Sequence, residues 1–177
     1  FKDPNPTAEQ LRQEQIRLKT QANKMMEQTH IMDVFAQHGK FLGIGGSYRY
    51  NLMVYPDLDI EFNANKLDKK AFIALLTDLA NHYAVRGINC VDTVHFASKT
   101  PGRPKGYWIG IEIPFEGDRW GIDCWLQETS GENYYNNDKY TARLASLEQW
   151  AVDAILSIKY QLIYQGLYGS RFLSVHV

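Results

Sequence analysis

The sequence predicts an α+β fold, in which a small mixed β-sheet is covered by helices on one side and long helices lie near both ends. Apolar residues recur at helical spacing in the first forty residues and again after residue 141, which predicts a long helix in each region. Between them lie short apolar or alternating segments typical of strands, at residues 41–44, 57–62, 90–97, 107–115 and 120–127. The resulting order, helix, strand, helix, strand, helix, strand, hairpin, helix, favours the α+β class.

The N-terminal region, residues 1–40, is predicted to be a helical extension of a domain formed by residues 41–177. Thr7 followed by Gln10 has the spacing of a capping box and predicts where the helix begins. A narrow apolar stripe then recurs at helical spacing until Gly39 ends the region; its members are Leu11, Leu18, Ala22, Met25 and Met32. We expect this stripe to pack on the domain, and the alternative is a dimerisation helix that would make the protein a homodimer.

The segment Gly45-Gly46-Ser47 directly follows the first predicted strand. Its glycines allow a sharp turn, and Ser47 is placed to cap a short helix over residues 48–53. The unpaired amides at such a helix start, together with the positive end of the helix dipole, favour a polyphosphate. We therefore expect Gly46 and Ser47 to contact phosphate groups.

A pair of carboxylates follows in Asp57-Leu58-Asp59-Ile60. Because strand side chains alternate, Asp57 and Asp59 point to one face while Leu58 and Ile60 can enter the core. Two adjacent carboxylates repel each other without a cation. A pair of Mg²⁺ ions would remove this repulsion and supply the means to activate a hydroxyl and stabilise a leaving pyrophosphate.

The middle of the chain is predicted to hold a helix over residues 68–85 that starts at Asp68, with Tyr83 on its buried side, and then the strand at 90–97. The Pro/Gly-rich loop 98–106 follows and carries three cations, Lys99, Arg103 and Lys105. We expect these cations to be solvated rather than to bind a ligand.

A hairpin is predicted to pair residues 107–115 with residues 120–127. If Phe115 faces Trp120, Glu112 lies opposite Asp123 on the same face of the sheet. Glu112 is then a candidate base, and the alternative is a glutamate that faces solvent.

The C-terminal part is predicted to contain a polar loop at residues 128–138, which includes Tyr134 and Tyr135, and a long helix from Thr141 to about Gly166. Lys159 lies beside the apolar stripe of this helix, where an unpaired ammonium group would be costly. We also expect a further helix after the given sequence, because it stops in the apolar run 172–177.

Composition narrows the function classes. The 177 residues have a formal net charge of -1 and a pI near 6.6, so no global basic field attracts nucleic acid. No stretch is apolar for long enough to span a bilayer and no signal-peptide pattern opens the sequence, so we expect a cytoplasmic protein. Cys90 and Cys124 are expected to be reduced core thiols, and the histidines lack the paired spacing of zinc ligands.

Residues 41–126 resemble the DNA polymerase β-like nucleotidyltransferase superfamily. The resemblance rests on Gly46-Ser47, a nine-residue spacer, Asp57-Leu58-Asp59-Ile60, and a third acid in Ile122-Asp123-Cys124. It implies a minimal nucleotidyltransferase fold in which Asp57 and Asp59 bridge two Mg²⁺ or Mn²⁺ ions and Asp123 holds the ion that activates the acceptor. It also implies that Gly46, Ser47 and neighbouring amides hold the β- and γ-phosphates.

By the same resemblance, the reaction is transfer of a nucleoside monophosphate from an NTP, such as ATP, to an acceptor hydroxyl, with release of pyrophosphate. Lys159 resembles a helical lysine that contacts the triphosphate in some small relatives, whereas a lysine that extends to solvent is the alternative; Arg49 has the same two interpretations. We expect a small-molecule acceptor. The alternatives are a toxin-like nucleotidyltransferase that modifies tRNA or protein, and a non-catalytic nucleotide-binding module.

Overall fold

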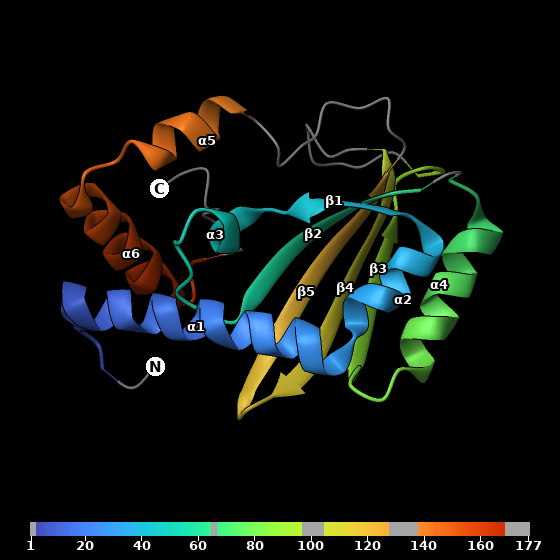
Figure 1. The fold of residues 1–177 in the computed structure, drawn as a ribbon, viewed down its shortest axis with the longest axis horizontal. Helices are drawn as coiled ribbons and strands as arrows, with labels where there is room; N and C mark the ends of the chain where they lie inside the picture. The colour runs from blue at the N-terminus through green and yellow to red at the C-terminus, as the bar shows by residue number, and fades with distance from the viewer. Residues whose placement is uncertain (1–2, 65–66, 97–104, 128–137, 169–177) are drawn as a thin grey trace.

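A five-stranded mixed sheet forms the centre of the computed structural model, which describes residues 3–64, 67–96, 105–127 and 138–168 (Figure 1). The strand order is β1-β2-β5-β4-β3. The strands are β1 (Lys40–Ile44), β2 (Asp57–Asn63), β3 (Gly87–Asp92), β4 (Gly106–Phe115) and β5 (Asp118–Gln127). β2 and β5 pair in parallel, while the other neighbouring strands are antiparallel. The α+β class with a mixed sheet is therefore confirmed.

Side-chain alternation gives the sheet two unlike faces. In β2, Leu58, Ile60 and Phe62 are fully buried, and in β5 the matching residues Ile122 and Cys124 are buried as well. The residues between them, which include the three aspartates, point the other way. We call this second side the acid face.

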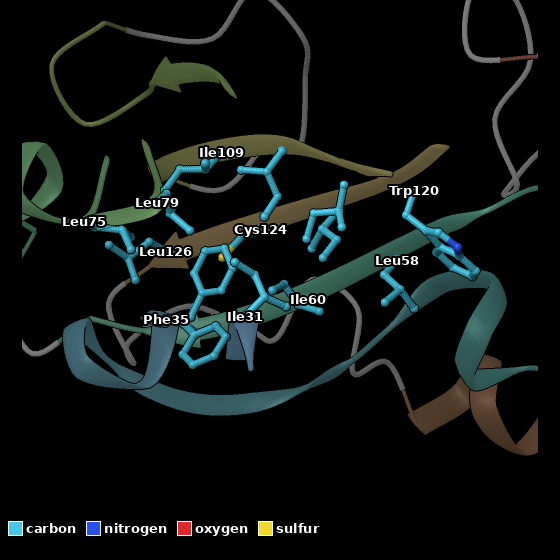
Figure 2. Packing of buried hydrophobic residues seen from close by; sticks show 14 of the residues in the cluster. Ile31, Phe35, Leu58, Ile60, Leu75, Leu79, Ile109, Trp120, Cys124 and Leu126 are labelled. Atoms are coloured by element: carbon cyan, nitrogen blue, oxygen red, sulfur yellow. The ribbon is translucent and has the colours of Figure 1, made fainter. Parts of the chain in front are cut away.

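Three helices cover the apolar face: α1 (Ala8–Thr29), α2 (Ile31–His38) and α4 (Lys69–Asn81). Figure 2 shows Ile31 and Phe35 of α2 near Ile60, and Leu75 and Leu79 of α4 above β5. The predicted stripe of α1 also packs on this core through Leu18, Ala22 and Met25. Residues on both sides of position 40 thus contribute to one continuous core.

The remaining helices are α3 (Gly46–Arg49), α5 (Asp138–Ala145) and α6 (Gln149–Tyr164). α6 lies beside the first half of α1 (Figure 1). A second, smaller core joins the two helices to the segment after α3; its buried members are Leu11, Leu52, Val54, Leu156 and Tyr160. At the surface of this contact, the Arg12 guanidinium lies 2.6 Å from Asp153. α6 is therefore held by α1 on one side and by the α3 region on the other.

Several predicted boundaries are confirmed. Thr7 and Gln10 form the capping box, and the Asp68 carboxylate accepts a hydrogen bond from the Ala71 amide at the start of α4. None of the helices within the described residues is long and apolar enough to cross a membrane.

Other boundaries were wrong. The N-terminal helix is broken at His30, whose φ of 56° lies in the left-handed region. α4 ends at Asn81, so Tyr83 lies beyond the helix and its side chain is 78% exposed. The third strand begins at Gly87 rather than at Cys90, and Cys90 is an exposed thiol on this edge strand rather than a core residue. The C-terminal helix is two helices, α5 and α6.

Candidate functional site

The three predicted acids meet on the acid face because β2 and β5 run in parallel at the centre of the sheet. Asp59 of β2 lies opposite Asp123 of β5, and Asp57 lies opposite Gly121. Neighbouring strands are about 4.8 Å apart, so the carboxylates of Asp59 and Asp123 are adjacent. The structure thus brings together residues that are distant in the sequence and that the sequence analysis assigned to one site.

Burial and mutual repulsion make the carboxylates of Asp57 and Asp59 difficult to ionise. Burial, together with the neighbouring charges of Asp57 and Asp123, raises the pKa of Asp59 to about 7. Burial also raises the pKa of Asp57, although the Tyr55 hydroxyl donates a hydrogen bond of 2.9 Å to its Oδ2 and favours the charged form. The Tyr55 hydroxyl in turn has a raised pKa, because it is buried beside Asp57. A cation at this position would relieve the repulsion.

Gly46 allows the loop after β1 to pack directly against Asp59. Its φ is +55°, and a Cβ atom built on it would lie 1.8 Å from Asp59 Oδ2. The Gly45 amide fixes the same loop by donating a 2.7 Å hydrogen bond to the backbone oxygen of Asp59. A residue with a side chain at position 46 would suffer both backbone strain and a clash with the carboxylate.

Ser47 does not cap the helix, contrary to the sequence prediction. α3 begins at Gly46 with Gly45 as its N-cap, which provides no side-chain hydrogen bond. The Ser47 hydroxyl instead accepts a hydrogen bond of 2.5 Å from the Lys159 ammonium group of α6, which also donates one of 2.8 Å to the Leu52 carbonyl. Two residues assigned to nucleotide binding from separate parts of the sequence are therefore in contact.

Lys159 is only 2% exposed, so the alternative of a lysine that extends to solvent is wrong. Burial lowers the pKa of its ammonium group to about 8, while the charges of Asp57 and Asp59 act in the opposite direction. The ammonium group is thus held in a region of low solvent access by Ser47 and by the negative field of the acids. Such a combination of burial, perturbed pKa and specific partners is typical of functional sites.

Glu112 does not lie opposite Asp123, and the register expected for the hairpin was wrong. Phe115 pairs with Asp118 rather than Trp120, so Glu112 lies opposite Gly121 and Gly110 lies opposite Asp123. The Arg119 guanidinium donates a hydrogen bond to the Glu112 carboxylate. The Nε atom of Arg86 lies 3.6 Å from Oε1 of the same carboxylate. Arg119 holds the pKa of Glu112 below its usual value, which makes this carboxylate a poor base.

The structure does not test the roles predicted for the remaining cations and loops. Arg49 is the last residue of α3, and Lys105 is exposed. Lys99, Arg103 and the tyrosine-containing loop at residues 128–137 lie outside the described residues. Their predicted roles stay predictions.

Glu61 is an acid-face residue that the sequence analysis missed. It continues the alternation of Asp57 and Asp59 along β2, and it is only 4% exposed. The Gln127 side-chain amide lies 3.4 Å from its Oε2. The period-two pattern that identified the first two acids could have identified this third one as well.

The donor chemistry of the site fits Mg²⁺, which prefers carboxylate oxygens. Asp57, Asp59 and Asp123 provide them, and the raised pKa of Asp59 reflects burial together with a like-charge repulsion that a divalent cation would relieve. Within the described ranges, no three acidic, histidine or cysteine side chains are already gathered as a metal-binding group. A search of protein-family models and a search of curated proteins found no match to this chain.

Proposed function

We propose that this protein is a metal-dependent nucleotidyltransferase, which transfers a nucleoside monophosphate from an NTP to a hydroxyl group of a small acceptor and releases pyrophosphate. The observation that carries the proposal is the placement of Asp57, Asp59 and Asp123 on one sheet face beside Gly46, with the Lys159 ammonium group bound to Ser47. The same residues carry the resemblance to the DNA polymerase β-like superfamily. Geometry and sequence pattern therefore support one function.

The three aspartates would hold two Mg²⁺ ions. When bound, the ions would neutralise the triphosphate and favour the ionised form of the acceptor hydroxyl. The contribution of the protein is to fix the carboxylates before the nucleotide arrives: Tyr55 orients Asp57 by a hydrogen bond, and Gly46 allows the loop to pack on Asp59. Preorganised charge and in-line positioning supply most of the rate enhancement that phosphoryl-type transfers need.

Lys159 and Ser47 would bind the β- and γ-phosphates. The ammonium group of Lys159 donates to Ser47 and to the Leu52 carbonyl, which fixes its position in the fold. A charge-assisted hydrogen bond from a buried, oriented ammonium group to a phosphate oxygen is stronger than one from a solvated lysine. The negative charge that develops on the leaving pyrophosphate would thus meet a fixed positive charge.

A small acceptor is favoured over a nucleic acid. Binding a strand through several phosphates requires many cations, and the whole chain has a formal net charge of -1. The acid face itself carries an excess of carboxylates, which would repel a polyanion. ATP is our first choice of donor because of its abundance, and the other NTPs serve as comparisons.

Pyrophosphate release measured with each NTP, Mg²⁺ or Mn²⁺ and pooled acceptors tests the proposal. The expected result is metal-dependent release that D57N and D123N abolish and that D33N, a change at an exposed aspartate, leaves unaltered. Labelled NTP then shows where the nucleotide is transferred. Label on RNA or protein alone would indicate the toxin-like alternative. Nucleotide binding without transfer to any acceptor would indicate the non-catalytic module.

A further inference from the structure

Two glycines in the central strands lie on the acid face beside the aspartates. Gly121 of β5 is adjacent to Asp57, because a Cβ atom built on it would lie 3.1 Å from Asp57 Oδ1. Gly110 of β4 is adjacent to Asp123 in the same way, at 3.4 Å from Asp123 Oδ1. Neither glycine has a positive φ, so the backbone does not require them. Glycine within a strand weakens the sheet and often marks a close approach. Gly110 is buried under the Trp108 indole, whereas Gly121 is partly exposed beside Asp57. We call Gly110 and Gly121 the glycine floor.

The indole of Trp108 borders this floor. A Cβ atom on Gly110 would lie 2.8 Å from Trp108 Cη2 and 3.0 Å from Cζ2, so the six-membered ring of the indole lies over Gly110. Trp108 is partly exposed, and Asn89 of β3, which pairs with Gly110, is exposed. An aromatic ring and a carboxylate thus lie beside one glycine, and Asn89 is its neighbour on the next strand.

We propose that Trp108 and the glycine floor form the acceptor subsite, and that the acceptor is a small polyhydroxylated ring such as a sugar or a cyclitol. The inference rests on the proposed function and adds the substrate class to it. The apolar C–H face of such a ring would pack on the indole, while one of its hydroxyl groups would face Asp123. Asn89 would supply a further hydrogen bond.

The transfer step forms one bond to phosphorus and breaks another. The ring hydroxyl oxygen forms a bond to the α-phosphorus of the NTP. The bond from that phosphorus to the oxygen that bridges to the β-phosphate breaks, and pyrophosphate leaves with the electron pair. The hydroxyl proton passes to water. Asp123 lies where the attacking oxygen must be held, and Trp108 fixes the ring that carries it.

The position of Trp108 and Asp123 beside the same glycine favours a ring hydroxyl over the 3′ end of a nucleic acid. Both side chains flank Gly110, so the stacked group and the reacting hydroxyl must be close neighbours. In a sugar or cyclitol the hydroxyl is one bond from the ring that stacks. In a nucleotide, the 3′-hydroxyl belongs to the ribose and is separated by several bonds from the base that would stack.

The test compares W108A and W108F with W150A, a matched change at an indole that is 69% exposed on α6. Saturation-transfer NMR measures binding of glucose, glucosamine, myo-inositol and an adenylate trinucleotide without requiring turnover. A parallel melting experiment with Mg²⁺ and each NTP measures nucleotide binding. For the ring that binds best, steady-state kinetics give its KM.

We expect W108A to weaken ring binding and raise the KM for the ring by about tenfold, the scale of one aromatic contact. W108F and W150A should stay within about threefold of the parent, and the NTP-induced melting shift should not change in any variant. Equal ring binding by W108A and the parent, or binding of the trinucleotide alone, would overturn the subsite. If Trp108-dependent ring binding occurs but no NTP shifts the melting temperature, the proposed function fails and the ring subsite stands.

Discussion

Replacement of Asp59 by asparagine should stabilise the metal-free protein above neutral pH. Burial beside Asp57 and Asp123 raises the pKa of Asp59 from 3.8 to about 7. Between these two values the folded state keeps a proton on Asp59 that the unfolded state has lost. The free energy of unfolding of the parent therefore falls as the pH rises through this window. The D59N variant carries no such proton and lacks this contribution.

The size of the effect follows from the shift. One pKa unit corresponds to about 1.4 kcal/mol, so a rise from 3.8 to about 7 amounts to about 4 kcal/mol once Asp59 is ionised in both states. Asp59 is partly exposed, and water screens its interactions, so this value is an upper limit. We expect D59N to be about 2 kcal/mol more stable than the parent at pH 8 and equally stable near pH 4.

Urea unfolding in EDTA at several pH values between 4 and 8 measures this difference. D33N serves as the control, because Asp33 is 73% exposed and its carboxylate lies away from the acid face. The curves for parent and D33N should run in parallel, while the D59N curve should diverge upward from them. Added Mg²⁺ should stabilise the parent at pH 8 more than D59N, since a cation favours ionised Asp59. If parent and D59N keep a constant difference across the whole range, Asp59 is not titrating in the fold and our account of the acid face is wrong.

Three further predictions concern the same site. G46A should lower the free energy of unfolding by about 1–3 kcal/mol and reduce transfer, because its Cβ atom would meet the Asp59 carboxylate at a positive φ; urea unfolding and initial rates check this. D123N should abolish transfer while its circular dichroism and melting temperature stay near those of the parent, and activity within a few-fold would show that Asp123 is misassigned. In the parent, the pKa of Lys159 is lowered from 10.5 to about 8, so the unfolded state binds more protons in between and stability should rise with pH there. K159M should lose this rise in urea unfolding and raise the KM for NTP about tenfold, and an unchanged KM would exclude contact with the triphosphate.

The acids could be predicted from the sequence because strand geometry is a local property. Alternation along one strand places Asp57 and Asp59 on the same face whatever the rest of the chain does. The pairing of Asp59 with Asp123 could not be derived in this way. It depends on β5 lying beside β2 in parallel, a choice made by the sheet order and not by either segment alone.

The hairpin register was missed because the turn was misjudged. A connection of residues 116–119 places Phe115 opposite Trp120, whereas the structure has a two-residue turn at Glu116 and Gly117. Both have positive φ, 45° and 87°, which matches the two-residue turns that suit the twist of a hairpin. Glycine at the second position was the available indication. Glu116, which precedes it, also has a positive φ, which is uncommon for a residue other than glycine, so the sequence did not indicate a two-residue turn. The break of the N-terminal helix at His30 was missed for the same reason.

The contact between Lys159 and Ser47 joins residues 112 positions apart, and it shows what helical periodicity cannot supply. The helical spacing of the apolar residues in α6 placed Lys159 at the edge of the apolar face of this helix. At that position a buried lysine and a solvated lysine were equally consistent with the sequence. The outcome depends on how α6 is held, and α1 contributes to that through the ion pair of Arg12 with Asp153. The N-terminal helix thus influences the site through its contact with α6.

The balance of charge at the site suggests why a nucleotide and a metal must act together. Asp59 lies among the like charges of Asp57, Asp123 and Glu61, whereas the buried ammonium group of Lys159 interacts with Asp57 and Asp59, so the ionised site has an excess of negative charge. A triphosphate without metal would add further negative charge, which the one positive charge of Lys159 could not compensate. Divalent cations reverse this balance, because they neutralise the aspartates and the phosphates at once. The same cations would remove the repulsion that raises the pKa of Asp59, so metal and nucleotide binding should stabilise the fold through the groups that weaken it when they are absent.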